Sequence, residues 1–257
     1  MLETEMKNMN KKSLSCSLSI FSLSVFMSSF HYFIPKAIAF PEVAEILDPA
    51  RNIVYQPSGD QPPPTSETNT SGSRGGCEDF QRDIKLTSLV PRSHIGESSD
   101  LTPTLVWYLP EHQTPAFSKV KIWEFNDQLE LSRMLDFSEP QKTRSGINQL
   151  ELSQTSIALS PNTRYLWEVI IECGSENIRT SVEIQTVDDN GLTNTYWYDL
   201  LASTFEDSQQ LDSLLISLIR EEEKNIEELQ SNNRGLAVQT REHIEFLEKI
   251  RLALSEN

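Results

Sequence analysis

The chain has 257 residues, of which 37% are apolar and 8% aromatic, and its formal net charge is -16. Apolar residues at this level can build a core, so wholesale disorder is excluded, and the length predicts one or two domains. The excess of acidic residues argues against binding to nucleic acids or to anionic lipid surfaces, because both need clustered Lys and Arg.

The N-terminal segment has the parts of a secretory signal peptide. Three lysines precede an apolar, Ser-rich stretch over residues 14–34, which Pro35 ends. Ala37 and Ala39 then supply the small-x-small cleavage pattern, which predicts a mature chain beginning at Phe40. The alternative is an uncleaved anchor, but the many serines keep the segment weakly apolar. We therefore expect an exported protein, periplasmic or at the cell surface, with no membrane span after cleavage.

Cleavage changes both the charge and the cysteine content. The removed segment carries four Lys and two Glu, so the net charge moves from -16 to -18. Of the three cysteines, Cys77 and Cys173 remain. In an oxidising compartment such a pair is most simply a disulfide, and closing so long a loop would contribute about 4–5 kcal/mol. Two buried free thiols are the alternative.

Composition divides the chain into four segments. Residues 1–39 are the signal peptide. Residues 40–78 are rich in Pro, Gly and Ser without periodicity, which predicts a flexible linker or arm. Residues 79–189 contain short alternating strands, and residues 190–257 have the period of helices.

The strand region predicts a mainly β fold, an immunoglobulin- or fibronectin-III-like antiparallel β-sandwich. The expected strands are residues 102–109, 117–125, 129–137, a fourth marked by Leu150, Leu152 and Ile157, then 165–173 and 182–187. In the fifth strand, Tyr165, Trp167 and Val169 share one face. The turn before it resembles a tyrosine corner, in which the Tyr165 hydroxyl bonds back to the turn backbone.

The C-terminal region predicts a unit of two or three helices that pack antiparallel against the sandwich. Asn194 or Thr195 would cap the first helix, the second follows Asp207, and the third spans Thr240 to Leu254 after a turn at residues 232–235. The acidic run of the second helix is expected to be a solvated face. Its members are Glu221, Glu222, Glu223, Glu227 and Glu228.

Several motifs together resemble a known family. They are Gly72 to Cys77, Leu86 to Pro91, Pro103 to Pro110, Tyr165 to Trp167 leading to Cys173, and Gly191 with Trp197, Tyr198, Asp199 and Leu201. Over residues 70 to 205 the sequence resembles the cyanobacterial domain-of-unknown-function family number 928. The resemblance implies an exported envelope protein and implies no activity.

The sequence contains no reaction signature. His94, His112 and His243 form no His-Glu-x-x-His motif, and no Cys-x-x-Cys or Gly-x-Ser-x-Gly pattern is present. His243 is expected to be solvated on its helix. The Asp-rich stretch 187–191 is better explained as a turn than as a calcium loop. We therefore predict no catalytic residue, no metal ligand and no cofactor.

The leading hypothesis is a non-catalytic module that binds another envelope protein or a glycan. If it does, Trp197 and Tyr198 are candidates for the binding surface, because Trp and Tyr often anchor interfaces; packing of the helix on the sandwich is their favoured role. One alternative is a carbohydrate-active hydrolase with acidic residues in a cleft between sandwich and helices. Another is a structural or assembly protein whose acidic helices pair with partners or divalent cations.

Overall fold

A computed structural model describes six segments of the chain, residues 53–57, 61–65, 85–112, 116–173, 176–188 and 196–255. The predicted cleavage residues Ala37, Ala39 and Phe40 lie outside these segments, and so does Cys77. The side chain of Cys173 is also outside the described part, so the predicted disulfide stays a prediction.

Two sheets form the sandwich. The three-stranded sheet is antiparallel, in the order β1 (Thr87–Ser88), β3 (Thr104–Leu109) and β6 (Gly146–Glu151). The five-stranded sheet has the order β2 (Gly96–Ser98), β8 (Glu176–Thr186), β7 (Arg164–Cys173), β4 (Ala116–Phe125) and β5 (Leu131–Thr143). Only the β2–β8 pair among these is parallel. A short 3-10 helix, Leu152–Gln154, follows β6.

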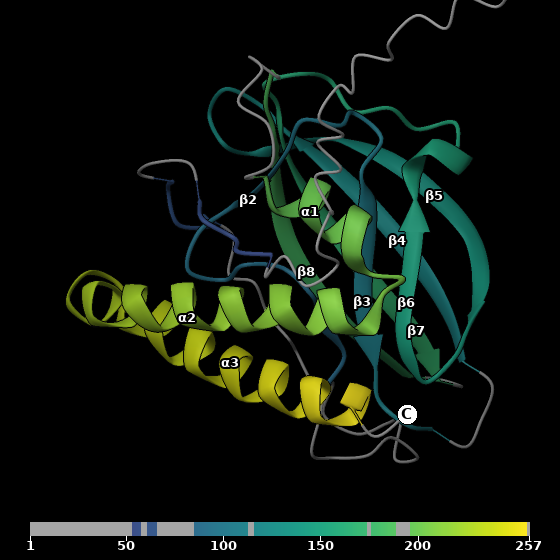
Figure 1. Ribbon diagram of the computed structural model, residues 1–257. Helices are drawn as coiled ribbons and strands as arrows, with labels where there is room; N and C mark the ends of the chain where they lie inside the picture. Colours follow the sequence, from purple (N-terminus) through teal and green to yellow (C-terminus); the bar gives the residue numbers. More distant parts are fainter. Residues whose placement is uncertain are drawn as a thin grey trace, which may run out of the picture. The chain divides into compact units, whose positions relative to one another are not determined.

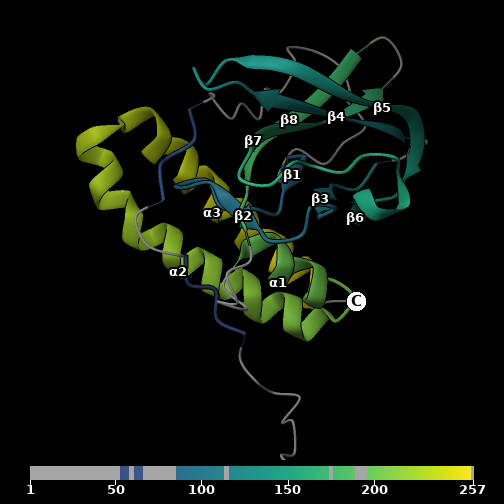
Figure 2. The ribbon, with the colours of Figure 1, turned by 90° about the horizontal axis from the view of Figure 1, so that it is seen from above.

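Three helices complete the fold, α1 (Trp197–Thr204), α2 (Ser208–Asn232) and α3 (Arg234–Ser255). The helices α2 and α3 run side by side (Figure 1). Seen from above, the three-stranded sheet lies between the five-stranded sheet and the helices (Figure 2). All six residues of β3 are buried, because both faces of this strand are covered. The predicted class, a mainly β sandwich with a C-terminal helical unit, is confirmed.

Strand β7 shows how the sequence pattern determines the sandwich. Tyr165, Trp167 and Val169 are buried between the layers, whereas Glu168 on the other face is partly exposed. The backbone N–H of Ser160 donates to the Tyr165 hydroxyl over 2.8 Å, which confirms the predicted tyrosine corner. This bond fixes the turn from which β7 starts.

The helix boundaries are partly as expected. Asp207 caps α2, because its Oδ1 accepts hydrogen bonds from the backbone N–H groups of Gln209, at 2.9 Å, and Gln210, at 3.2 Å. The predicted start of the third helix at Thr240 is wrong, since α3 begins at Arg234. There the Oδ1 of Asn233 accepts from the Leu236 N–H over 3.1 Å, so Asn233 caps a helix that contains Gly235. The turn between α2 and α3 is therefore shorter than predicted.

No helix in the described segments has the length and apolar character that a membrane crossing requires.

Candidate functional site

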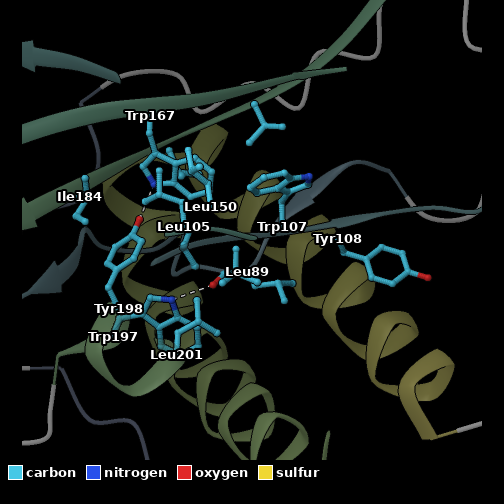
Figure 3. Close-up of a cluster of buried hydrophobic side chains, with 14 of the residues drawn as sticks. Leu89, Leu105, Trp107, Tyr108, Leu150, Trp167, Ile184, Trp197, Tyr198 and Leu201 are labelled. Carbon is cyan, nitrogen blue, oxygen red and sulfur yellow. Dashed lines mark hydrogen bonds between the residues drawn. The ribbon is translucent and has the colours of Figure 1, made fainter. Parts of the chain in front are cut away.

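The two residues predicted as a possible binding surface are in the core. Trp197 and Tyr198 are fully buried at the start of α1, where this helix lies against the sheets (Figure 3). The Trp197 Nε1 donates to the Leu89 carbonyl over 2.9 Å, and the Trp167 Nε1 donates to the Tyr198 hydroxyl over 2.7 Å. They therefore form no exposed surface, and packing of helix on sandwich is the role they have. A Cβ on Gly96 would lie 2.9 Å from the Tyr198 ring, so the close approach needs glycine there.

The acidic face of α2 includes one carboxylate that is fully buried. Glu222 accepts hydrogen bonds from the backbone N–H groups of Arg92, at 2.6 Å, and Ser93, at 3.2 and 3.0 Å to its two oxygens. Burial raises the pKa of Glu222 to about 7, although these bonds and the Arg92 charge act in the opposite direction. The expectation of a wholly solvated acidic run is therefore wrong at this position, because the loop after β1 needs an acceptor there.

Arg92 connects this loop to the five-stranded sheet. Its guanidinium donates to the Ser181 carbonyl and to the Thr180 hydroxyl of β8, both over 3.1 Å. Burial lowers the pKa of Arg92 to about 10, so the group is still charged at neutral pH. Glu222 accepts from the Arg92 backbone while the Arg92 guanidinium donates to β8, so the two residues together join α2 to the sandwich through the loop.

A second polar chain begins in the predicted linker. The Tyr55 hydroxyl lies 2.7 Å from the His94 Nε2, and the Ser93 Oγ lies 2.8 Å from the His94 Nδ1. The Asn225 side-chain amide of α2 donates to the same Ser93 oxygen over 2.9 Å. Burial lowers the pKa of His94 to about 4, so the imidazole is neutral at physiological pH. These groups link three segments that are distant in sequence.

At residues 53–57 the structure differs from the flexible arm predicted for residues 40–78, most of which lies outside the described segments. Tyr55 is only 3% exposed, and its ring meets that of Trp197 edge to face at a centroid distance of 4.9 Å. Its backbone N–H donates to the Ser217 hydroxyl over 2.9 Å. Composition missed this anchoring because a single buried aromatic side chain leaves no periodicity in the sequence.

Next to this polar chain lies a pocket of about 570 Å³, here called the α2 pocket. From α2 and its C-terminal end, six side chains line it: Glu221, Asn225, Glu228, Leu229, Asn232 and Asn233. From the other two segments come Ser93, His94, Pro57, Gln61 and Pro63. The pocket lies where the loop after β1, the packed N-terminal segment and the second half of α2 meet. Pockets of this size commonly hold small ligands or side chains of a partner.

The other two histidines contact backbone carbonyl groups. His243 of α3 was expected to be solvated but is buried, and its Nε2 donates to the Val90 carbonyl over 2.9 Å. Burial lowers the pKa of His243 to about 3. The Nδ1 of His112 lies 3.1 Å from the Pro110 carbonyl, within its own loop. Within the described segments no three His, Cys, Asp or Glu side chains gather to hold a metal ion.

The Ser93–His94 pair at the α2 pocket differs from a catalytic triad. Ser93 and His94 have the spacing of a nucleophile and its base, but an imidazole with a pKa of about 4 is a weak base at neutral pH. The second nitrogen of His94 bonds to a tyrosine hydroxyl, where a catalytic triad would have a carboxylate. Glu222, the carboxyl group with the raised pKa, does not line the pocket. What remains is a set of fixed hydrogen-bonding groups.

A second hollow, of about 490 Å³, lies at the end of the sandwich. It is bordered by the turn between β4 and β5, which contains Leu129 at a φ of 60°, and by the turn before β7, which contains Asn162 at a φ of 52°. Leu129 is about half exposed. Arg164 in its lining is held by the buried Glu183, but the two turns that border the hollow are largely exposed, so the α2 pocket is the stronger candidate.

Comparisons with known proteins give a family and two distant structures. No curated protein is similar to this chain at a significant level. A polysaccharide monooxygenase of type CBM33 is 11% identical with a TM-score of 0.22, over 37% of this chain and 61% of that chain. A lytic polysaccharide monooxygenase important for chitin utilization in Cellvibrio japonicus is 12% identical with a TM-score of 0.22, over 44% and 73%. At this level of similarity, neither structure supports a conclusion about the fold or the function of this chain.

The family comparison covers the sandwich. A family described as Domain of Unknown Function (DUF928) matches residues 69–194. This range contains most of the motifs on which the resemblance was based, from the turn ending in Cys77 to the strand ending in Cys173. Through residues 69–194 the chain therefore belongs to the DUF928 family.

Proposed function

We propose that this chain is an exported, non-catalytic binding module that holds part of an envelope protein or a glycan in the α2 pocket. The observation that carries the proposal is the construction of the pocket from three separate segments, whose polar groups are fixed from behind by buried hydrogen bonds. A preformed site of this kind binds without the cost of ordering its own side chains.

The same construction argues for binding over hydrolysis. The two carboxylates in the described lining of the pocket, Glu221 and Glu228, come from the same face of one helix, seven residues apart on α2. Paired carboxyl groups of glycosidases lie about 5–9.5 Å apart across a bound sugar, with one of them kept protonated by its surroundings. Glu221 is instead paired with Lys224, whose Nζ lies 2.6 Å from its Oε2.

Export is the second part of the proposal, and the leader supports it. The basic start, the apolar stretch and the Ala37-Ile38-Ala39 pattern support cleavage that leaves a mature N-terminus at Phe40. A binding module in the periplasm or at the cell surface would meet envelope proteins and glycans. Its acidic surface favours solubility and binding to basic partners, and it is repelled by anionic lipid head groups.

The experiment captures partners from an envelope fraction with the mature chain, whose N-terminus is first sequenced after expression with its leader. Asn232→Trp places a large side chain in the pocket, and Leu252→Trp places the same side chain on an exposed position of α3 as the control. We expect an N-terminus at Phe40 and a partner retained by the wild type and the control but lost by Asn232→Trp. Equal retention by both variants, or no partner under any condition, would count against the module.

A further inference from the structure

We infer that the α2 pocket takes a donor-only cationic group, an ammonium or a guanidinium, and this inference rests on the proposed function of the pocket. Among the described residues that line the pocket, the charged side chains are both acidic, Glu221 and Glu228. Seven residues correspond to about two turns of helix, so both carboxylates project from the same face of α2. No Lys or Arg is among the lining residues that the structure describes.

The neutral groups of the pocket agree with this charge. His94 contributes no positive charge at neutral pH, because burial lowers its pKa to about 4. The Arg92 guanidinium is directed to the Thr180 hydroxyl and the Ser181 carbonyl of β8, and the buried Glu222 stabilises its charge electrostatically. Arg92 is not among the described lining residues, so it adds no positive charge to the described wall of the pocket.

The hydrogen-bonding groups also favour a donor. The amide nitrogen of Asn225 is engaged by Ser93, so its carbonyl oxygen is the group left to meet a ligand. The end of α2, at Asn232 and Asn233, forms another part of the wall. Ammonium and guanidinium groups donate hydrogen bonds and accept none, so they match the two carboxylates and the Asn225 oxygen.

The remaining walls suit the aliphatic stem of such a group. Pro57, Pro63 and Leu229 are apolar, and they come from both sides of the pocket. Lysine, arginine and polyamines all carry methylene stems that pack on apolar surface while the charged head meets acidic partners. The Lys224 ammonium that pairs with Glu221 is largely exposed, so a ligand can compete with it in water.

The test is calorimetric titration of the mature chain with two cationic probes and two neutral ones. The cations are spermidine and a capped Gly-Gly-Arg-Gly-Gly peptide. The neutral probes are the same peptide with citrulline for arginine, and diacetylchitobiose. We expect saturable binding of at least one cation and none of the citrulline peptide. Binding of spermidine alone indicates a free polyamine as the source, and binding of the arginine peptide alone indicates a protein segment.

Two double variants give the matched comparison. Glu221→Gln with Glu228→Gln removes both lining charges, and Glu223→Gln with Glu227→Gln removes two exposed charges of the same helix that do not line the pocket. We expect about tenfold weaker cation binding in the first variant and less than about twofold in the second. Equal weakening in both, or no saturable cation binding, overturns the inference. If Asn232→Trp still abolishes partner capture in that case, the binding module stands and only its ligand class is wrong.

Discussion

At the scale of single residues, Glu222 has the most consequence. Its carboxyl group is enclosed between α2 and the loop after β1, and it satisfies two backbone N–H groups that no water reaches. Leaving such donors without an acceptor costs about 1–3 kcal/mol each. The buried carboxyl group of Glu222 thus allows the loop from β1 toward β2 to pack against α2.

The raised pKa of Glu222 predicts an unusual pH dependence. The folded value of about 7 lies above the ordinary value of 4.5, so the folded state holds a proton that the unfolded state releases between these values. The stabilisation by this group is therefore complete below about pH 4.5 and is lost as the pH rises through about 7. We expect the difference in free energy of unfolding, wild type minus Glu222→Gln, to fall between pH 5 and 8.

Urea unfolding across this range measures the difference. His94 and His243, whose lowered pKa values act in the opposite sense and reduce stability as the pH falls below about 6.5, are present in both proteins and cancel. Glu223→Gln, at an exposed position of the same helix, is the control and should give a flat difference. A difference that grows with pH would contradict the burial argument.

At the scale of elements, the short segment Ile53 to Pro57 behaves as part of the helical layer. Tyr55 contributes an aromatic contact with Trp197 and a hydrogen bond to His94, and the backbone bonds to α2. Removing a buried aromatic side chain typically costs about 3–5 kcal/mol. This segment therefore stabilises the pocket wall that it also helps to build.

Tyr55→Ala and Val54→Ala test this role. Val54 is the adjacent residue and is 65% exposed, so its truncation should cost less than about 0.5 kcal/mol. We expect Tyr55→Ala to lower the free energy of unfolding by about 3 kcal/mol in chemical denaturation, with loss of the aromatic circular-dichroism signal from the Tyr55–Trp197 pair. Similar values for the two variants would show that the segment is only loosely attached.

The elements with strong patterns were predictable from the sequence. The alternation in β7, the tyrosine corner and the start of α2 after Asp207 each follow from local chemistry, so Tyr165 has the role expected of it and α2 begins where expected. The strands β1 and β2 were not predicted, because a strand of two or three residues is too short to show an alternation of apolar and polar residues. The pocket was missed for another reason. Ser93, Asn225 and Tyr55 are brought together only by tertiary packing, which spacing along the chain does not encode.

At the scale of the whole folded unit, the family match and the cooperative core do not coincide. The match ends at residue 194, before α1 begins, yet Trp197, Tyr198 and Leu201 of α1 are fully buried in the same hydrophobic cluster as the sandwich residues. The three-stranded sheet is covered on one face by helices from outside the matched range (Figure 2). The sandwich alone therefore lacks part of its core.

A chain that ends at Phe205, without α2 and α3, should expose this core. We expect it to accumulate in the insoluble fraction, or to bind the dye ANS and unfold without a sharp transition, because the leucines that α2 buries leave apolar surface uncovered. The full mature chain prepared in parallel is the control. A truncated chain with the same urea midpoint as the full one would show that the sandwich is an independent domain.

The central position of β3 also determines how deeply its backbone is protected. Its amides are enclosed between β1 and β6 in the sheet, and layers cover the strand above and below. Local fluctuations that release edge strands cannot expose such groups to solvent, so their protons exchange with deuterium only when the entire unit opens. The slowest amides, around Leu105 to Trp107, would then give a direct reading of global stability, and a ligand that seals the distant α2 pocket would slow them in proportion to its occupancy.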